Sequence, residues 1–228
     1  MHTTAYMLGQ LFLQSYIPKK GRYKLVELGS GDFNGSLRQF CPANTEYIGL
    51  DFAEGKNVDI VLKSSYELPF KDNSIDFVIS TSCSEHSEFF WLSFQEIFRI
   101  LKPNGLFYIN APSNGDFHRH PMDCWRFYPD ASMAFIKWAA HCGHERPCVL
   151  ESFMKEPDGD IWRDYTAVFL KDSPNDNTYF MMNEKYLDPE KRYHFVLNSL
   201  YEKKENLYDI YCTFNINSNY FKIYFSNF

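Results

Sequence analysis

The chain has 228 residues, a formal net charge of −6 and an apolar content of 45%. This length and apolar content predict a folded protein with its own core, which excludes intrinsic disorder as a class. The negative charge, without any lysine- and arginine-rich run, argues against a nucleic-acid partner. No apolar stretch approaches the ~18 residues of a membrane span, and the N-terminus carries no secretory signal pattern. We therefore expect a cytoplasmic protein with no membrane partner.

Helical and strand patterns alternate along the first 171 residues. Apolar residues at helical spacing predict helices at 5–17, from about 36, at 89–101 and at 130–141, the last of them capped by Asp130. Apolar runs bounded by turn residues predict strands at 23–28, 46–50, 58–62, 75–80, 106–111, 149–153 and 165–170. Strands that alternate with helices in this order predict an α/β fold: a Rossmann-like, doubly wound and mostly parallel sheet with an antiparallel edge.

The composition changes after residue 171, where a short stretch rich in Asp, Asn, Ser and Pro indicates a linker. Beyond it the chain is rich in Tyr and Phe, with a charged helix predicted around 189–206 and strand or sheet-edge structure over 208–228. We therefore divide the chain into a domain of residues 1–171 and an aromatic-rich C-terminal extension of residues 172–228. The extension is expected to pack on the core or on a second copy of the chain, which would form a homodimer.

Six cysteines are scattered without a paired framework, so we expect reduced thiols rather than disulfides. His141, Cys142, His144 and Cys148 stand close together in the sequence. They lack the second CxxC or HxxxH pair that zinc sites use, and a surface turn after a helix explains them equally well. No metal site is predicted.

The stretch from Leu25 to Gly35 is the strongest local signal for a ligand. A buried strand runs into Gly29 and Gly31, whose backbone can take positive φ and approach a nucleotide-like cofactor closely. The N-terminus of a following helix is expected to add free N–H groups. A dinucleotide site requires a third glycine three residues after the second, and that place holds Asn34. The evidence for NAD is therefore weak.

The rest of the N-terminal half resembles a class I S-adenosylmethionine-dependent methyltransferase. The resemblance rests on five stretches in the family's order and spacing, at residues 26–31, 47–51, 68–76, 85–86 and 96–105. It continues through the motif His118-x-His120-Pro121-x-Asp123-Cys124-Trp125-Arg126-Phe127, which is similar to a subgroup often found with surface-glycan genes. The chain departs from the family at Ser64 and Ser65, where an acid and an alanine are common.

The resemblance implies S-adenosylmethionine as the cofactor and assigns its binding residues. Those are Glu27, Gly29 and Gly31 for the methionine and ribose, Asp51 for the ribose hydroxyls, Phe52 for the adenine face, Ser65 and Tyr66 in the adenine loop, and Ser80 at the end of a strand. Asp51 ends the second strand and would suit a ribose in either the NAD or the methyltransferase scheme.

Methyl transfer to a hydroxyl needs a group that accepts its proton, and a histidine near neutral pKa suits this task. The candidates for it are His86, His118, His120 and Asp123. Arg126 is expected to hold an anionic part of the substrate, with Trp125 and Tyr128 as stacking walls. The alternative is structural: an Arg–Asp pair and aromatic residues that pin a loop. Glu85 is expected only to orient its neighbour.

We therefore expect an enzyme that O-methylates a sugar or phosphate-type group of a surface-polysaccharide precursor, with a small-molecule or nucleotide-linked glycan as acceptor. Two alternatives remain open. The first is a non-catalytic cofactor-binding or assembly module of the same fold. The second is a methyltransferase that acts on another small molecule.

Overall fold

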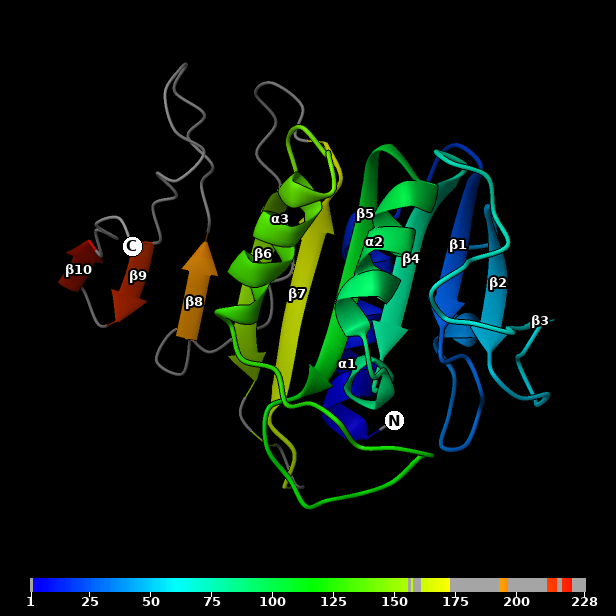
Figure 1. Ribbon diagram of the computed structural model, residues 1–228, viewed down its shortest axis with the longest axis horizontal. Helices are drawn as coiled ribbons and strands as arrows, with labels where there is room; N and C mark the ends of the chain where they lie inside the picture. Colours follow the sequence, from blue (N-terminus) through cyan, green and yellow to red (C-terminus); the bar gives the residue numbers. More distant parts are fainter. Residues whose placement is uncertain are drawn as a thin grey trace.

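The computed structural model describes residues 2–155, 157 and 161–172, together with the strand backbones 193–196, 213–216 and 219–222. One sheet runs through it in the order β10-β9-β8-β6-β7-β5-β4-β1-β2-β3 (Figure 1). Its strands are β1 Tyr23–Leu28, β2 Thr45–Asp51, β3 Ile60–Val61, β4 Ile75–Thr81, β5 Leu101–Pro112, β6 Cys148–Lys155, β7 Asp164–Leu170, β8 Tyr193–Val196, β9 Thr213–Ile216 and β10 Asn219–Lys222.

The strands from β3 to β5 are parallel, and β7 pairs antiparallel with both β5 and β6. This is the predicted doubly wound, mostly parallel sheet with an antiparallel edge. The chain leaves β1 toward β2 on one side and returns to β4 on the other, so the strand order reverses between β1 and β4. Ligands of open α/β sheets bind at such a reversal, outside the carboxyl ends of the strands.

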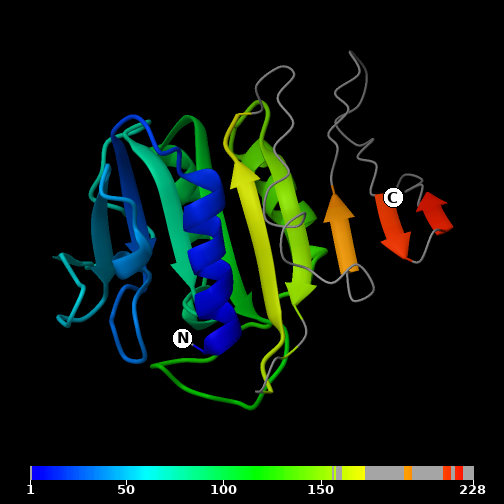
Figure 2. The same ribbon diagram turned by 180° about the vertical axis from the view of Figure 1, so that it is seen from behind.

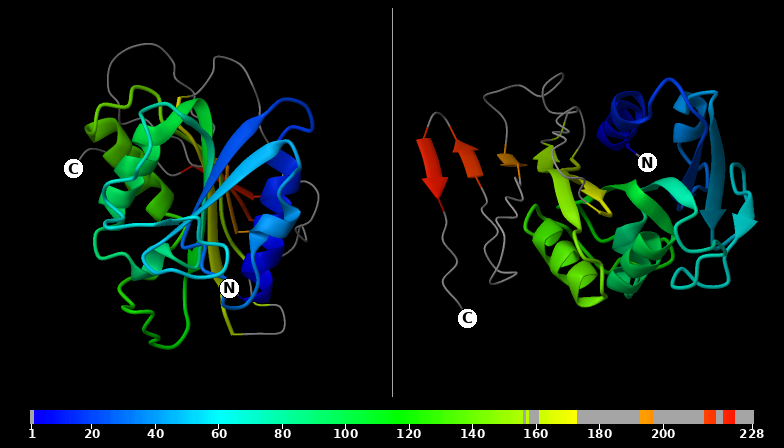
Figure 3. Two further views of the ribbon diagram at one scale, coloured as in Figure 1. Left: turned by 90° about the vertical axis from the view of Figure 1, so that its right-hand side faces the viewer. Right: turned by 90° about the horizontal axis from the view of Figure 1, so that it is seen from above.

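Three helices cover the two faces of the sheet: α1 Thr3–Tyr16, α2 Phe90–Ile100 and α3 Ala131–His141. Figure 1 shows α2 and α3 on the near face, Figure 2 shows α1 on the opposite face, and the right-hand view of Figure 3 shows the sheet between them. On α2, Phe94, Ile97 and Phe98 are buried because their spacing puts them on one side of the helix. The sheet therefore has a hydrophobic core on each face.

Three local expectations were wrong in detail. The helix after the glycine turn is only a 3-10 turn, η1 Leu37–Phe40, so no helix N-terminus faces the turn. Pro42 ends the segment before an α-helix can form. Asp130 precedes α3 but has helical backbone angles and makes no capping hydrogen bond through its side chain. The strand predicted at 106–111 begins earlier, because β5 starts at Leu101, and its register with β4 shifts between Leu101 and Leu106.

The C-terminal extension adds strands to the free edge of β6 through β8. The helix predicted around 189–206 was wrong at 193–196, where the chain forms β8. The open edge of β6 offers backbone partners that helical spacing cannot reveal. Strand structure within 208–228 is confirmed at β9 and β10, and the remaining positions of both predictions lie outside the described residues.

The division at residue 171 and the homodimer stay predictions. Among the described residues, every helix falls short of the length and apolarity that a membrane crossing requires.

Candidate active site

A cavity of about 770 Å³ lies at the carboxyl ends of β1, β2, β4 and β5, where the strand order reverses. Its volume is in the range of about 300–1,000 Å³ that small-molecule sites occupy. The loop between β5 and α3 passes beneath these strand ends in Figure 1, and its residues 118–122 line the cavity. The predicted site residues that line the cavity are Gly29, Gly31, Asp51, Phe52, Ser65, Tyr66, Ser80, His86, His118 and His120.

The glycine turn and Asp51 form one unit. Gly29 has φ of +76°, and its N–H donates to Leu50 O at 2.9 Å. The Gly31 N–H donates to Asp51 Oδ2 at 2.9 Å, and the Phe52 N–H donates to Asp51 Oδ1 at 2.7 Å. These bonds fix the carboxylate at the cavity wall while each oxygen keeps a lone pair for a ligand hydroxyl.

The glycine turn gives the first testable prediction. A methyl group at Gly29 would lie 2.6 Å from Cys83 Cβ on a backbone with positive φ, so Gly29→Ala is expected to lower the free energy of unfolding by about 1–3 kcal/mol. Gly55→Ala is the matched control, because its new Cβ would meet nothing closer than Val58 at 3.8 Å. Urea unfolding of both variants measures the difference. Equal stabilities would contradict the close approach of Cys83 to the turn.

Aromatic and hydroxyl side chains surround Asp51. Phe52 is 62% exposed and lies on the cavity wall, where its ring can cover a flat base. Ser64 and Ser65 line the opposite part of the wall, and the Ser64 hydroxyl accepts the Tyr66 N–H at 3.1 Å. The Tyr66 hydroxyl accepts the backbone N–H of Phe89 at 3.2 Å. The adenine loop predicted from the resemblance therefore borders the same cavity as Asp51.

Glu27 differs from the other predicted cofactor residues because it is buried in β1 and is not among those lining the cavity. Its carboxylate accepts a hydrogen bond from the Tyr47 hydroxyl. Burial raises the pKa of Glu27 to about 7, against the lowering effect of the Tyr47 bond and of nearby Arg38. Its predicted contact with the methionine amino group stays a prediction.

The raised pKa of Glu27 makes stability depend on pH. The folded state binds this proton more tightly than the unfolded state, so stability falls as pH rises from about 4.5 through 7. This difference in the pKa of Glu27 between the unfolded and folded states corresponds to a loss of up to about 3 kcal/mol in the free energy of unfolding. We expect Glu27→Gln, which keeps an acceptor for Tyr47, to lose this dependence. Exposed Glu46, on the neighbouring strand, supplies the control variant Glu46→Gln, which should follow wild type. Denaturant unfolding at pH 5 and pH 8 measures it, and parallel curves for Glu27→Gln and wild type would contradict the assignment.

The segment after β4 contains residues that the sequence predictions left out. Ser82 has φ of +49°, a conformation that costs energy in a residue with a side chain. The hydroxyls of Thr81 and Ser82 are buried without a hydrogen-bond partner among the described residues, although both residues line the cavity. A polar run from Thr81 to His86, directly after a buried strand, is the signal that could have identified them. Strain and unpaired polar atoms at a cavity wall are typical of a ligand site.

His86 is the last residue of the short 3-10 turn η2 Ser84–His86. The His86 Nδ1 atom bonds the carbonyl oxygen of Met122, and its Nε2 lies 3.6 Å from Glu85 Oε1. Burial lowers the pKa of His86 and raises that of Glu85 to about 8. His118 Nδ1 lies 3.1 Å from the carbonyl oxygen of Asp116.

The three predicted histidines come together. The ring centroid of His86 lies 5.2 Å from that of His118 and 6.4 Å from that of His120. His120 packs edge-on against Phe33 at 4.7 Å, and Phe33 follows the glycine turn. The histidine wall, defined as His86, His118 and His120, therefore faces the same cavity as the turn that would hold the cofactor.

Three further predicted residues of this loop, Asp123, Trp125 and Arg126, are not among those lining the cavity. Both Asp123 oxygens bond the Arg126 guanidinium, and this contact is the chief reason that the pKa of Asp123 lies well below its usual range. Arg126 also donates to Asp116 O at 3.0 Å, and Asp123 Oδ2 accepts the His118 N–H at 2.8 Å. Trp125 donates its indole N–H to Ser87 O at 2.8 Å. This is the arrangement of the structural alternative, and it holds His118 in place.

Tyr128 is 56% exposed on the same loop and also stands apart from the cavity lining. The roles predicted for Asp123, Trp125, Arg126 and Tyr128 at the acceptor stay predictions.

Two distant segments complete the wall. His2 bonds Asp164 Oδ1 through Nε2 at 2.7 Å and stacks on Trp162, and both His2 and Trp162 line the cavity. The Trp162 ring lies 5.1 Å from that of His118. His2 and Trp162 are far apart in the sequence and carry no local motif, so sequence reasoning had no signal for them.

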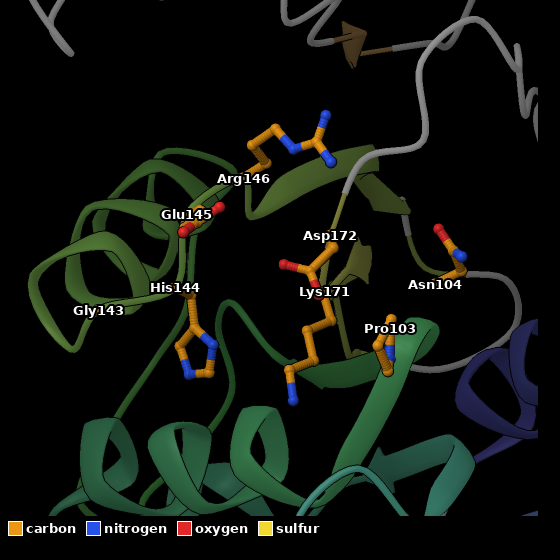
Figure 4. A pocket seen from close by; sticks show the side chains of 8 residues that line it. All are labelled: Pro103, Asn104, Gly143, His144, Glu145, Arg146, Lys171 and Asp172. Carbon is orange, nitrogen blue, oxygen red and sulfur yellow. The ribbon is translucent and has the colours of Figure 1, made fainter.

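A second pocket of about 450 Å³ lies at the opposite edge of the sheet, near the start of β5. In Figure 4, His144 and Lys171 point into it. The Lys171 amine donates to Leu101 O at 2.6 Å and to Asn73 Oδ1 at 2.7 Å. Of the four residues considered for zinc, His144 alone lines this pocket.

The sequence and the fold are similar to those of known methyltransferases. Residues 26–109 match the family described as "Methyltransferase domain". An uncharacterized methyltransferase of Mycobacterium leprae is 32% identical over 155 residues, which are 62% of this chain and 56% of that protein. The demethylmenaquinone methyltransferase of Staphylococcus aureus is 31% identical over 101 residues, 39% of this chain and 42% of that protein. The chain thus spans about half the length of the curated relatives it matches.

A solved structure supports the same fold. The 1,6-didemethyltoxoflavin-N1-methyltransferase of Burkholderia thailandensis, with bound 1,6-didemethyltoxoflavin and S-adenosylhomocysteine, superposes with a TM-score of 0.54 at 14% identity, covering 74% of this chain and 79% of that one. The family match begins at β1 and ends in β5, so it contains the glycine turn, Asp51 and His86. Residues 26–109 therefore match a methyltransferase domain, and the chain has the Rossmann-like fold of class I S-adenosylmethionine-dependent methyltransferases.

Proposed function

We propose that this protein transfers the methyl group of S-adenosylmethionine to an oxygen atom of a sugar or phosphate-type group on a surface-polysaccharide precursor. The observation that carries the proposal is the single cavity that joins the glycine turn and Asp51 to the histidine wall. A candidate cofactor site and a set of proton-accepting groups share one cavity, as methyl transfer to a hydroxyl requires.

The cofactor half of the cavity suits an adenosine-bearing ligand. A Cβ on Gly31 would lie 3.0 Å from both Asp51 Oδ2 and the Phe33 ring, so only glycine leaves the space beside the carboxylate open. Asp51 can accept from two ribose hydroxyls, and Phe52 can cover the base. S-adenosylmethionine bound here supplies a methyl group already activated by a positively charged sulfur.

The histidine wall supplies lone pairs for the acceptor half. The acceptor oxygen loses its proton to an imidazole and forms a bond to the methyl carbon. S-adenosylmethionine held by the glycine turn and Asp51 would supply that carbon, and its sulfur would keep the electron pair of the carbon–sulfur bond, which would leave S-adenosylhomocysteine. Asp123 is a weaker base for this step than the imidazoles, because the contact with Arg126 holds its pKa low.

The lining supports a polar acceptor with flat apolar faces. Ser82, Ser84 and Ser87 lie on the wall near the histidines and offer hydroxyl groups to a sugar. Phe90 and Trp162 line the same space and offer rings for its apolar face. Demethylmenaquinone, named for the S. aureus relative, is the competing acceptor to test.

The test is a transfer assay with methyl-labelled S-adenosylmethionine, the full chain and pooled nucleotide sugars, glycan precursors or demethylmenaquinone. We expect label in the nucleotide-sugar or glycan fraction. Label in demethylmenaquinone alone would favour the methyltransferase of another small molecule. Cofactor binding without transfer to any acceptor would favour the non-catalytic module.

A further inference from the structure

We propose that Glu85, His86 and His118 bind one divalent transition-metal ion at the acceptor side of the cavity. One potential ligand atom from each residue lies within 4.8 Å of the other two. All three residues line the cavity, so an ion held by them has open positions toward the acceptor. The binding of the ion stands on these contacts, and its role in methyl transfer rests on the proposed function.

Glu85 is the first reason. Its side chain is 1% exposed, and its Oε2 atom has no hydrogen-bond partner among the described residues. Its Oε1 atom lies 3.6 Å from His86 Nε2, which is beyond an ordinary hydrogen bond. A buried carboxylate oxygen without a partner costs free energy, and a bound cation removes that cost.

The orientation of the two imidazoles is the second reason. His86 Nδ1 bonds Met122 O and His118 Nδ1 bonds Asp116 O. A carbonyl can only accept, so Met122 O places the proton on His86 Nδ1. For His118, Asp116 O at 3.1 Å favours the same tautomer over the more distant Arg126 Nη2 donor at 3.5 Å. In this tautomer each Nε2 has a free lone pair. Histidines that bind metals are commonly held in this way, through a backbone carbonyl or carboxylate on the other ring nitrogen. The pattern sets the tautomer that a metal needs.

The chemistry of the set selects the ion. Two imidazoles and one carboxylate are ligands of zinc and other transition metals, whereas Mg²⁺ and Ca²⁺ take mainly oxygen ligands. Ligand atoms around a tetrahedral zinc are about 3.3 Å apart, so the longest separation in the set, up to 4.8 Å, must close by about 1.5 Å. The His118 side chain is 36% exposed, so its imidazole can shift toward the ion while the backbone N–H keeps its bond to Asp123 Oδ2.

A metal ion at this position would favour an acceptor that attacks through an oxygen atom. A hydroxyl oxygen bound beside the ion loses its proton more readily than a free hydroxyl. His120, the histidine outside the set, is then placed to take that proton while the oxygen forms its bond to the methyl carbon. The competing explanation is a proton shared between Glu85 and His86, which needs no metal and gives no role to His118.

The experiment titrates Zn²⁺ and Co²⁺ into the chelator-treated full chain by calorimetry and, for Co²⁺, by visible absorption. We expect one ion per chain in wild type and at least ~10-fold weaker binding in both Glu85→Gln and His118→Gln. His144→Gln, in the pocket at the opposite sheet edge, should bind the ion like wild type. No binding by wild type, or equal affinity in His118→Gln and wild type, would overturn the proposal in favour of the shared proton.

S-adenosylhomocysteine affinity, measured on the same samples, serves as the folding control. If Glu85→Gln misfolds, the variant in the exposed loop, His118→Gln, decides the question. Cofactor binding without metal binding overturns the metal site and leaves the proposed function standing. Metal binding without cofactor binding overturns the proposed function and leaves the metal site standing.

Discussion

Asp51→Ala is expected to weaken the binding of S-adenosylmethionine and S-adenosylhomocysteine by at least ~100-fold. A hydrogen bond to a charged group contributes about 1.5–3 kcal/mol, and this carboxylate offers one to each of two ribose hydroxyls. The variant also removes the acceptor of the Gly31 and Phe52 N–H groups, so the turn loses its support. Calorimetry with S-adenosylhomocysteine measures the change without requiring the acceptor.

The control for Asp51 is Asp130→Asn. Asp130 precedes α3, makes no capping bond through its side chain, and is not among the residues lining the cavity. Its replacement should leave cofactor affinity at the wild-type value. If Asp51→Ala bound the cofactor as tightly as wild type, the prediction that Asp51 binds the ribose hydroxyls would be wrong.

His86→Gln and His118→Gln are expected to lower methyl transfer by about 10²- to 10⁴-fold, the usual contribution of proton transfer to a positioned group. The expectation is the same whether these imidazoles accept the proton or hold a metal ion, because both roles use the Nε2 lone pair. Glutamine keeps a polar group of similar length but has no comparable lone pair. Single-turnover transfer at saturating cofactor measures the loss.

The matched control for the histidines is His144→Gln, since His144 lines the other pocket (Figure 4). Its transfer rate should equal that of wild type. Cofactor affinity should be unchanged in all three variants, which separates a chemical loss from a structural one. Full activity in both His86→Gln and His118→Gln would exclude the histidine wall from the reaction. Chelator treatment of wild type then separates the two roles. Loss of activity indicates that the histidines hold a metal ion, and unchanged activity indicates that they accept the proton.

The glycine turn shows how far local sequence reasoning reaches. A strand that runs into Gly29 and Gly31 needs only neighbouring residues to define it, and the structure has β1 at the predicted residues. Asp51 could be placed because parallel strands bring their carboxyl ends to one edge. The same reasoning brought His86 and His118 to one rim, since they follow neighbouring parallel strands.

Other parts of the site depend on contacts between distant segments. Sequence could not decide between a substrate-binding Arg126 and an Arg–Asp pair that pins the loop, because the choice depends on how the loop folds back on itself. Glu85 was expected only to orient a neighbour, yet its burial beside His118 places it in a candidate metal site. Burial is a property of the packed chain and has no local signature.

The order of apolar runs and turn residues by itself determined the α/β class, the approximate strand positions and the glycine turn, because these follow from spacing along the chain. The cofactor was predicted from the family resemblance. Only the tertiary structure decided that 193–196 pairs with β6 instead of forming a helix. It also decided that His2 and Trp162 line the cavity, and that the histidines share this cavity with Glu85, whose Oε2 atom has no partner among the described residues. Each of these features depends on contacts between segments that are distant in the sequence. Such contacts form only in the folded chain, so no local sequence pattern reveals them.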